Sequence, residues 1–152
     1  MRRSERKITD RNEIDAIIRS SLVCRLAFAG GGRPYIVPLC FGLLGDTLYF
    51  HSASEGKKID LLRDNPEVCF EFDNGCELVL AESSCQIGMN YQSVIGIGRA
   101  SIVTDPEERK IALDTIVRQY VTDVTDFSEE SLKRTLVFKV EITEMTGKRA
   151  QR

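Results

Sequence analysis

Hydrophobic and polar residues change their spacing several times along the chain, and each change predicts a structural element. The residues that recur at helical spacing near the N-terminus are Ile14, Ile17, Ile18 and Leu22. This spacing predicts a first helix that ends near Ser20 or Ser21. The preceding residues Asp10-Arg11-Asn12-Glu13 have the form of a capping box, which places the start of that helix after Asp10.

The next segments are apolar strands separated by glycine turns. Gly30-Gly31-Gly32 and Gly45-Asp46 divide three predicted strands, at 23–28, 35–44 and 47–52. Two hairpin turns that join three strands favour an antiparallel meander. The following segment, 56–65, ends at Asn65-Pro66, which predicts a short helix.

The second half of the chain continues in the same way. Val68, Phe70 and Phe72 alternate with acidic residues in 67–73, a pattern typical of a half-buried strand. Further strands are expected at 77–87, 93–103 and 136–142. One helix is expected after Asp105-Pro106, with an apolar stripe formed by Leu113, Ile116, Val117 and Tyr120, and a short one at 128–134. The sequence therefore predicts a mainly β fold of about seven antiparallel strands with peripheral helices, whose closure into a barrel would remove exposed edges.

Composition indicates an ordinary globular protein. The chain has 152 residues, of which 42% are hydrophobic and 29% charged, so residues 1–152 are expected to form a single domain. A net charge of −2 gives no overall attraction to nucleic acid or to an acidic membrane surface. The basic N-terminus is not followed by an apolar segment, so it does not have the form of a signal peptide, and a cytoplasmic location is expected.

The five cysteines do not have the spacing of a metal site. They are Cys24, Cys40, Cys69, Cys76 and Cys85, with no CxxC pair. The single histidine, His51, has no neighbouring thiol, so no metal site is expected. Cys24, Cys40 and Cys69 lie in apolar segments, where they are expected to act as small, reduced hydrophobic residues.

One segment combines groups that favour an anion. His51-Ser52-Ala53 ends a predicted strand, and Gly56-Lys57-Lys58 then begins a helix. Unpaired amides at a helix N-terminus attract anions, whereas the helix dipole disfavours lysines there. The two lysines therefore indicate a bound phosphate, and the alternative is that Lys57 and Lys58 lie on a solvated face.

Two other segments leave alternatives open. Pro38 lies within a predicted strand, which is compatible with an edge, a bulge or contact with a ligand. Gly96 and Gly98 follow Ser93 in a later strand, where small residues either face a ligand or form part of the barrel wall.

These segments together resemble the pyridoxamine-phosphate-oxidase-like FMN-binding proteins, and within them the nitroimidazole-resistance flavoprotein branch. The resemblance rests on Arg33–Phe41, Leu48–Lys58 and Met89–Ala100, and it extends over almost the whole chain. It implies an FMN-binding split β-barrel of roughly six to seven strands. It also implies a homodimer, with two FMN molecules in the grooves between the subunits.

The resemblance assigns the predicted cofactor-binding residues to three groups. The residues expected along the isoalloxazine ring are Val37, Pro38, Leu39, Cys40 and Phe41. Those expected at the ribityl chain and phosphate are His51, Ser52, Ala53, Lys57 and Lys58. Ser93 and Val94 match the strand that borders the flavin from the other side.

The resemblance favours an oxidoreductase that reduces small acceptors such as nitroaromatics, with NAD(P)H as the expected donor. The chain departs from the pyridoxamine-phosphate oxidases because its phosphate pair is Lys-Lys and no set of substrate arginines is evident. No catalytic residue is assigned; His51 is the candidate proton donor. The alternatives are a non-catalytic FMN-binding or storage protein, a redox sensor, and, with less support, haem binding through His51.

Overall fold

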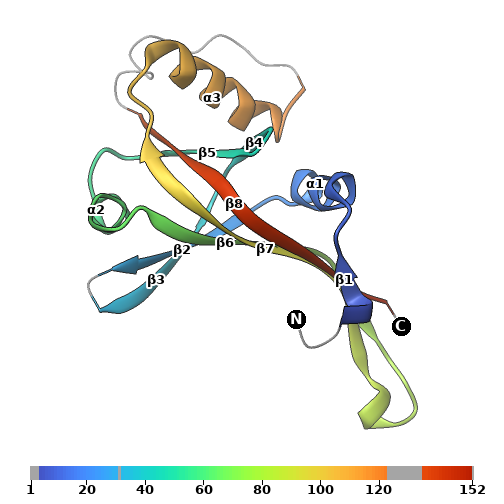
Figure 1. Ribbon diagram of the computed structural model, residues 1–152. Coiled ribbons are helices and arrows are strands. Elements are labelled where there is room, and N and C mark those ends of the chain that lie inside the picture. Colours follow the sequence, from blue (N-terminus) through green and yellow to red (C-terminus); the bar gives the residue numbers. More distant parts are fainter. Residues whose placement is uncertain (1–3, 31, 123–134, 152) are drawn as a thin grey trace.

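A twisted antiparallel sheet with three helices around it forms the fold (Figure 1). The computed structural model describes residues 4–30, 32–122 and 135–151. Within them the helices are α1 (Arg11–Ser20), α2 (Lys57–Asp64) and α3 (Pro106–Arg118), with short 3-10 segments at Ser4–Arg6 and Ser84–Gln86. The strands are β1 (Lys7–Ile8), β2 (Cys24–Gly30), β3 (Arg33–Leu39), β4 (Gly42–Leu44), β5 (Thr47–Ser52), β6 (Glu67–Val79), β7 (Gly88–Ile102) and β8 (Leu136–Ala150).

The sheet has two free edges and is not closed into a barrel. Its strand order is β3-β2-β6-β7-β8-β5-β4, and β1 pairs with β8 outside this path. The terminal strands β3 and β4 do not pair with each other, so the barrel is split. The mainly β, split-barrel prediction is confirmed, with eight strands in place of about seven, and the sheet retains the edges that closure would have removed.

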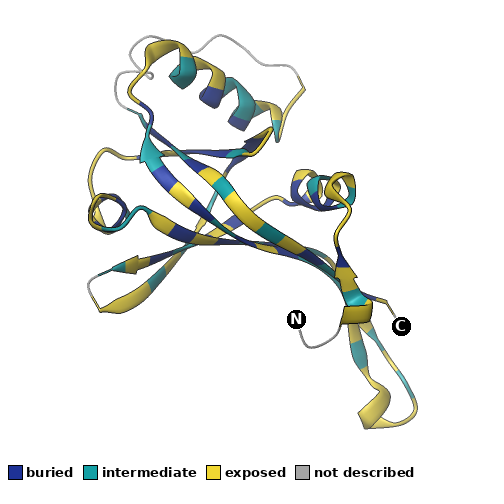
Figure 2. Cartoon of the chain, viewed as in Figure 1, coloured by how far each residue is buried: buried dark blue, intermediate teal, exposed yellow. Residues whose placement is uncertain are grey.

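The core lies between the inner faces of these strands. Figure 2 shows buried and exposed residues alternating along β6 and β7, as expected for strands with one packed face. The largest fully buried side chains include six aromatic rings: Phe28, Phe41, Phe50, Phe70, Phe72 and Phe138. Helix α3 packs against β4 and β5, α2 against β2, and α1 against β6 and β7.

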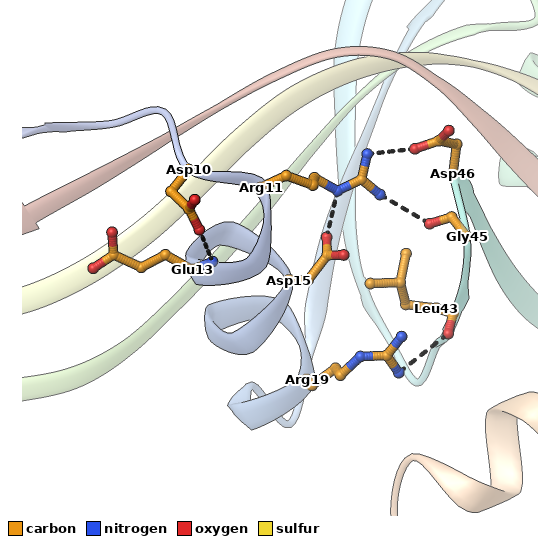
Figure 3. A network of polar contacts seen from close by, with 8 residues as sticks. All are labelled: Asp10, Arg11, Glu13, Asp15, Arg19, Leu43, Gly45 and Asp46. Atoms are coloured by element: carbon orange, nitrogen blue, oxygen red, sulfur yellow. Dashed lines mark hydrogen bonds and ion pairs between the residues drawn. The ribbon is translucent and has the colours of Figure 1, made fainter.

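Helix α1 is fixed by polar contacts at its start. The Asp10 carboxylate accepts a hydrogen bond from the Glu13 amide at 2.9 Å, which confirms the predicted cap. Figure 3 shows that Arg11 then joins α1 to the β4–β5 turn. Its guanidinium donates to Asp15 at 2.7 Å and to the Gly45 carbonyl at 3.0 Å, and it also pairs with Asp46.

The predicted strand 35–44 is wrong in one respect, because the chain leaves the sheet at Cys40 and Phe41. The Phe41 amide donates to the Tyr120 hydroxyl oxygen at 3.0 Å, and that hydroxyl donates to the Leu22 carbonyl at 3.0 Å. The Phe41 ring is fully buried, with its centroid 4.7 Å from that of Phe72. These contacts turn the chain out of β3 and into β4, on the opposite edge of the sheet.

The boundaries of the later strands also differ from the prediction. β6 continues to Val79 through a bulge between Asn74 and Glu77, with Gly75 at φ 62°, so 77–87 is not a separate strand. β7 begins at Gly88 and β8 extends to Ala150, beyond the predicted 93 and 142. The predicted helix at 128–134 lies outside the described residues.

The cysteines are less buried than expected. Cys24 is fully buried, whereas Cys40 and Cys69 are exposed, because Cys40 lies where the chain leaves β3 and Cys69 points away from the core. In the described parts of the chain, no helix is long and apolar enough to cross a bilayer.

Gly96 and Gly98 form part of the barrel wall. A Cβ atom at Gly96 would lie 2.2 Å from Phe70 Cζ and 2.6 Å from the Glu144 carbonyl oxygen. At Gly98 it would lie 2.5 Å from Val140 Cγ1. The space next to both glycines is therefore filled by the protein itself, which decides between the two interpretations left open by the sequence.

We expect Gly96→Ala to lower the free energy of unfolding by about 1–3 kcal/mol, because the added methyl group overpacks a filled core. Denaturant unfolding of the variant and the parent protein measures this. Arg99→Ala, an exposed position on the same strand, is the control and should change stability by less than about 0.5 kcal/mol. Unchanged stability of Gly96→Ala would show that the space beside Gly96 is open.

Candidate functional site

The connection between β5 and α2 forms the start of the candidate site. β5 ends at Ser52, and Gly56 precedes α2 with φ 118°, a conformation that favours glycine. No side chain caps the helix. The Ile59 amide already donates to the Gly56 carbonyl at 2.9 Å, so in the described structure the first-turn amides left for an anion are those of Lys57 and Lys58.

Ser52 places an unpaired hydroxyl group at this connection. Its side chain is almost buried, with 8% exposure, and within the described part of the chain its Oγ has no hydrogen-bond partner. An unsatisfied buried hydroxyl costs about 1–3 kcal/mol. A ligand oxygen that accepts from Ser52 would remove this cost. The neighbouring residues His51 and Ala53 are exposed.

The two lysines begin α2, and Lys57 connects the helix to the edge strand β3. Lys57 Nζ lies 4.4 Å from the centroid of the Tyr35 ring, and Tyr35 belongs to β3. Lys58 is half-buried and Lys57 exposed. Two positive charges thus lie at the positive end of the helix dipole, an arrangement that a bound anion would stabilise. The sequence did not identify Tyr35 as part of the site, although it lies in a segment that carries the resemblance.

The predicted ring-binding residues lie on β3 and just after it. Val37 and Leu39 pack towards the core, whereas Pro38 and Cys40 are exposed. Because β3 is an edge of the sheet, Pro38 occupies an edge position, one of the three alternatives that the sequence allowed.

Unlike Val37 to Cys40, Phe41 uses both its ring and its backbone amide in contacts within the protein. The ring is fully buried, and the amide donates to Tyr120. Burial raises the pKa of Tyr120 to about 12, so its hydroxyl keeps the proton that it donates to Leu22. Tyr120 is thus a positioning residue for the chain after β3, and its predicted place in a helical stripe did not reveal that role.

Ser93 and Val94 lie far from the other predicted site residues of the same chain. On β8, Ser52 pairs with Leu136 and Ser93 pairs with Lys148. At about 3.3 Å per residue, these partners are roughly 40 Å apart along the strand. Val94 is also fully buried in the core. One chain therefore does not bring Ser93 next to Lys57.

Comparisons with known proteins agree with this fold. A crystal structure of a candidate 5-nitroimidazole antibiotic resistance protein from Bacteroides thetaiotaomicron is 36% identical, with a TM-score of 0.84, over 96% of this chain and 90% of that one. An FAD-binding protein from Mesorhizobium loti is 27% identical, with a TM-score of 0.70, over 96% and 98% of the two chains. An FAD- and haem-binding protein from Mycobacterium smegmatis shares the fold. It is 20% identical, with a TM-score of 0.87, over 97% of this chain and 74% of that one.

Sequence comparison gives a shorter match and a longer one. An uncharacterised protein of Rhizobium meliloti is 34% identical over 65 residues, which are 43% of this chain and 42% of the relative. The family model described as pyridoxamine 5'-phosphate oxidase matches residues 10–149. The chain therefore belongs to the pyridoxamine 5'-phosphate oxidase family.

Proposed function

We propose that the protein binds FMN and uses it to reduce small acceptors such as nitroaromatics. The observation that carries the proposal is the unpaired, buried Ser52 hydroxyl beside an uncapped helix N-terminus that bears two lysines. A terminal phosphate satisfies all three features, since it accepts hydrogen bonds and carries the opposite charge. One helix N-terminus with one lysine pair suits a single phosphate, which favours FMN over FAD.

The residues present fit a bound FMN. Ser52, Lys57 and Lys58 would hold the phosphate, with His51 and Ala53 next to the ribityl chain. Val37 to Cys40 would border the ring along the exposed edge of β3, where backbone groups are not paired with another strand. The flavin would supply the electron transfer, and the protein would position it and set the polarity around the ring.

The proposed assembly is a homodimer. Ser93 lies too far from Lys57 in one chain for both to border the same flavin, whereas a second subunit provides another copy of its strand. NAD(P)H is the proposed electron donor. The 36% identity to a candidate nitroimidazole resistance protein supports a nitroaromatic acceptor.

Replacing either Lys57 or Lys58 by alanine should weaken FMN binding about ten- to a hundredfold. Charge-assisted contacts of roughly 1.5–3 kcal/mol are lost in each variant. Riboflavin, which lacks the phosphate, should bind almost as to the parent protein. Calorimetric titration of both flavins into each variant measures the difference.

Two control variants accompany the lysine variants. Lys110→Ala removes an exposed lysine from α3 and should leave both affinities unchanged. His51→Ala should reduce FMN affinity less than either lysine variant does. Equal losses for FMN and riboflavin in the lysine variants would contradict a phosphate contact.

Ser52→Ala should separate ligand binding from stability. The hydroxyl has no partner in the described structure, so its removal should leave the stability of the flavin-free protein unchanged or higher. FMN affinity should fall about five- to tenfold, as expected for one lost hydrogen bond. Thermal unfolding with and without FMN tests both expectations; a less stable flavin-free protein with unchanged FMN affinity would contradict them.

Turnover distinguishes a reductase from a protein that only stores FMN or senses redox state. The FMN-loaded protein should consume NAD(P)H in the presence of a nitroaromatic acceptor, with stoichiometric loss of the nitro compound. Absorbance at the nicotinamide band follows the reaction. A protein that holds FMN and consumes no NAD(P)H would favour the binding or sensing alternative.

A further inference from the structure

A cavity of about 360 Å³ lies where α1, β4 and α3 meet. Its volume is within the range of roughly 300–1,000 Å³ that is typical of small-molecule sites. The described residues that line it are all separate from the candidate phosphate site between β5 and α2. In Figure 1, α1 and α2 lie on opposite sides of the molecule. We refer to this second hollow as the α1–α3 cavity.

The walls of the α1–α3 cavity are fixed to one another. Helix α3 rests directly on the edge strand β4, because a Cβ atom at Gly42 would lie 2.6 Å from the Thr115 carbonyl carbon. The Gln119 side chain donates to the Arg19 carbonyl at 2.8 Å, which joins the ends of α3 and α1. Arg11 joins α1 to the β4–β5 turn (Figure 3). The cavity is therefore formed before a ligand binds, which lowers the entropic cost of binding.

Apolar side chains form a large part of the cavity lining. Leu43 is buried, whereas Leu44 and Ile111 each have an exposure of 50%. The Thr115 hydroxyl already donates to the Ile111 carbonyl at 2.7 Å, so its proton is not free for a ligand. A ligand with a hydrocarbon body would remove the apolar surface of Leu44 and Ile111 from water, which favours binding.

Two arginines supply positive charge at the same cavity. Arg19 donates to the Leu43 carbonyl over a long 3.4 Å (Figure 3), and its guanidinium has no other partner among the described residues. Arg118 pairs with Asp114 through Nε at 2.7 Å, which leaves its two terminal amino groups without a partner in that part of the chain. Because Asp114 offsets one arginine, the described lining carries one net positive charge.

We propose that the α1–α3 cavity binds a small organic carboxylate with an aromatic or branched apolar body. A planar guanidinium matches a carboxylate in bidentate geometry, and one carboxylate balances the single net charge of the lining. A phosphate group, at about −1.5 to −2 charge at pH 7, exceeds that charge and leaves the apolar lining uncovered. This site goes beyond the proposed function and does not depend on the flavin.

Calorimetric titration of benzoate into the flavin-free protein tests the proposal. Benzoate should bind with a Kd of about 1 mM or lower. Benzamide, which has the same ring without the charge, and acetate, which has the charge without the ring, should each bind at least tenfold more weakly. In NMR spectra, benzoate should shift the amide resonances of Leu44, Ile111 and Thr115. Saturating benzoate should also raise the Tm, because a ligand that binds only the folded state stabilises it.

Two variants and a matched control make the test specific. Arg19→Gln removes the guanidinium and Ile111→Glu places a carboxylate on the apolar lining, so each should weaken benzoate binding at least tenfold. Both positions are exposed, so circular dichroism should show an intact fold. Arg63→Gln removes the equivalent basic residue in the last turn of α2 and should leave benzoate affinity unchanged. No binding of benzoate, equal affinity for benzamide, or unchanged affinity in Arg19→Gln would overturn the proposal, whatever the outcome of the flavin titrations.

Discussion

The hydrogen bond from the Phe41 amide to the Tyr120 hydroxyl fixes the point where the chain crosses from one edge of the sheet to the other. Its partners are held in turn by the Leu22 carbonyl and by the contact between the Phe41 and Phe72 rings. Because the chain leaves the sheet here, β3 and β4 remain separate edges and the barrel stays split. β3 is thereby left as an open strand next to α2, with Lys57 over Tyr35.

The net charge of the chain does not indicate the local positive potential of the proposed phosphate site. The chain carries a net charge of −2, yet two lysines, first-turn helix amides without a side-chain cap and, among the described residues, an unpaired buried hydroxyl lie together at the connection from β5 to α2. Each of these features costs stability in the absence of an anion. Functional sites often combine groups that lower local stability, and three such groups lie together at this one connection.

The sequence predicted the elements better than it predicted their boundaries. The Asp10 cap, the break between β2 and β3, the turn at Gly45–Asp46 and the helix after Gly56 depend on local chemistry, so a few residues were enough to predict them. The end of β3 depends on Tyr120, nearly eighty positions further along the chain, and no local pattern marks it. The extension of β8 to Ala150 follows from pairing with β7 and β1, which overrides a polar segment with little strand character of its own.

In the candidate site too, the sequence predicted the arrangement of residues that are adjacent in the chain and failed for residues that are distant in it. His51 to Lys58 form one continuous segment, and the structure keeps their predicted relation because a strand, a glycine and a helix follow each other directly. Ser93 and Val94 matched the family strand, but a match does not say how far that strand lies from Lys57 in the folded chain. The separation along β8 and the burial of Val94 show that one chain does not assemble the whole group.

Identifying which cofactor the purified protein binds is the most direct test of the proposed phosphate site. The protein is purified, or reconstituted with a mixture of FMN, FAD, riboflavin and haem, and the bound molecule is released and identified by absorption spectrum and mass. We expect FMN at one molecule per chain. Selective retention of FAD or haem, or no bound flavin after reconstitution, would contradict the assignment of Ser52, Lys57 and Lys58 to a terminal phosphate.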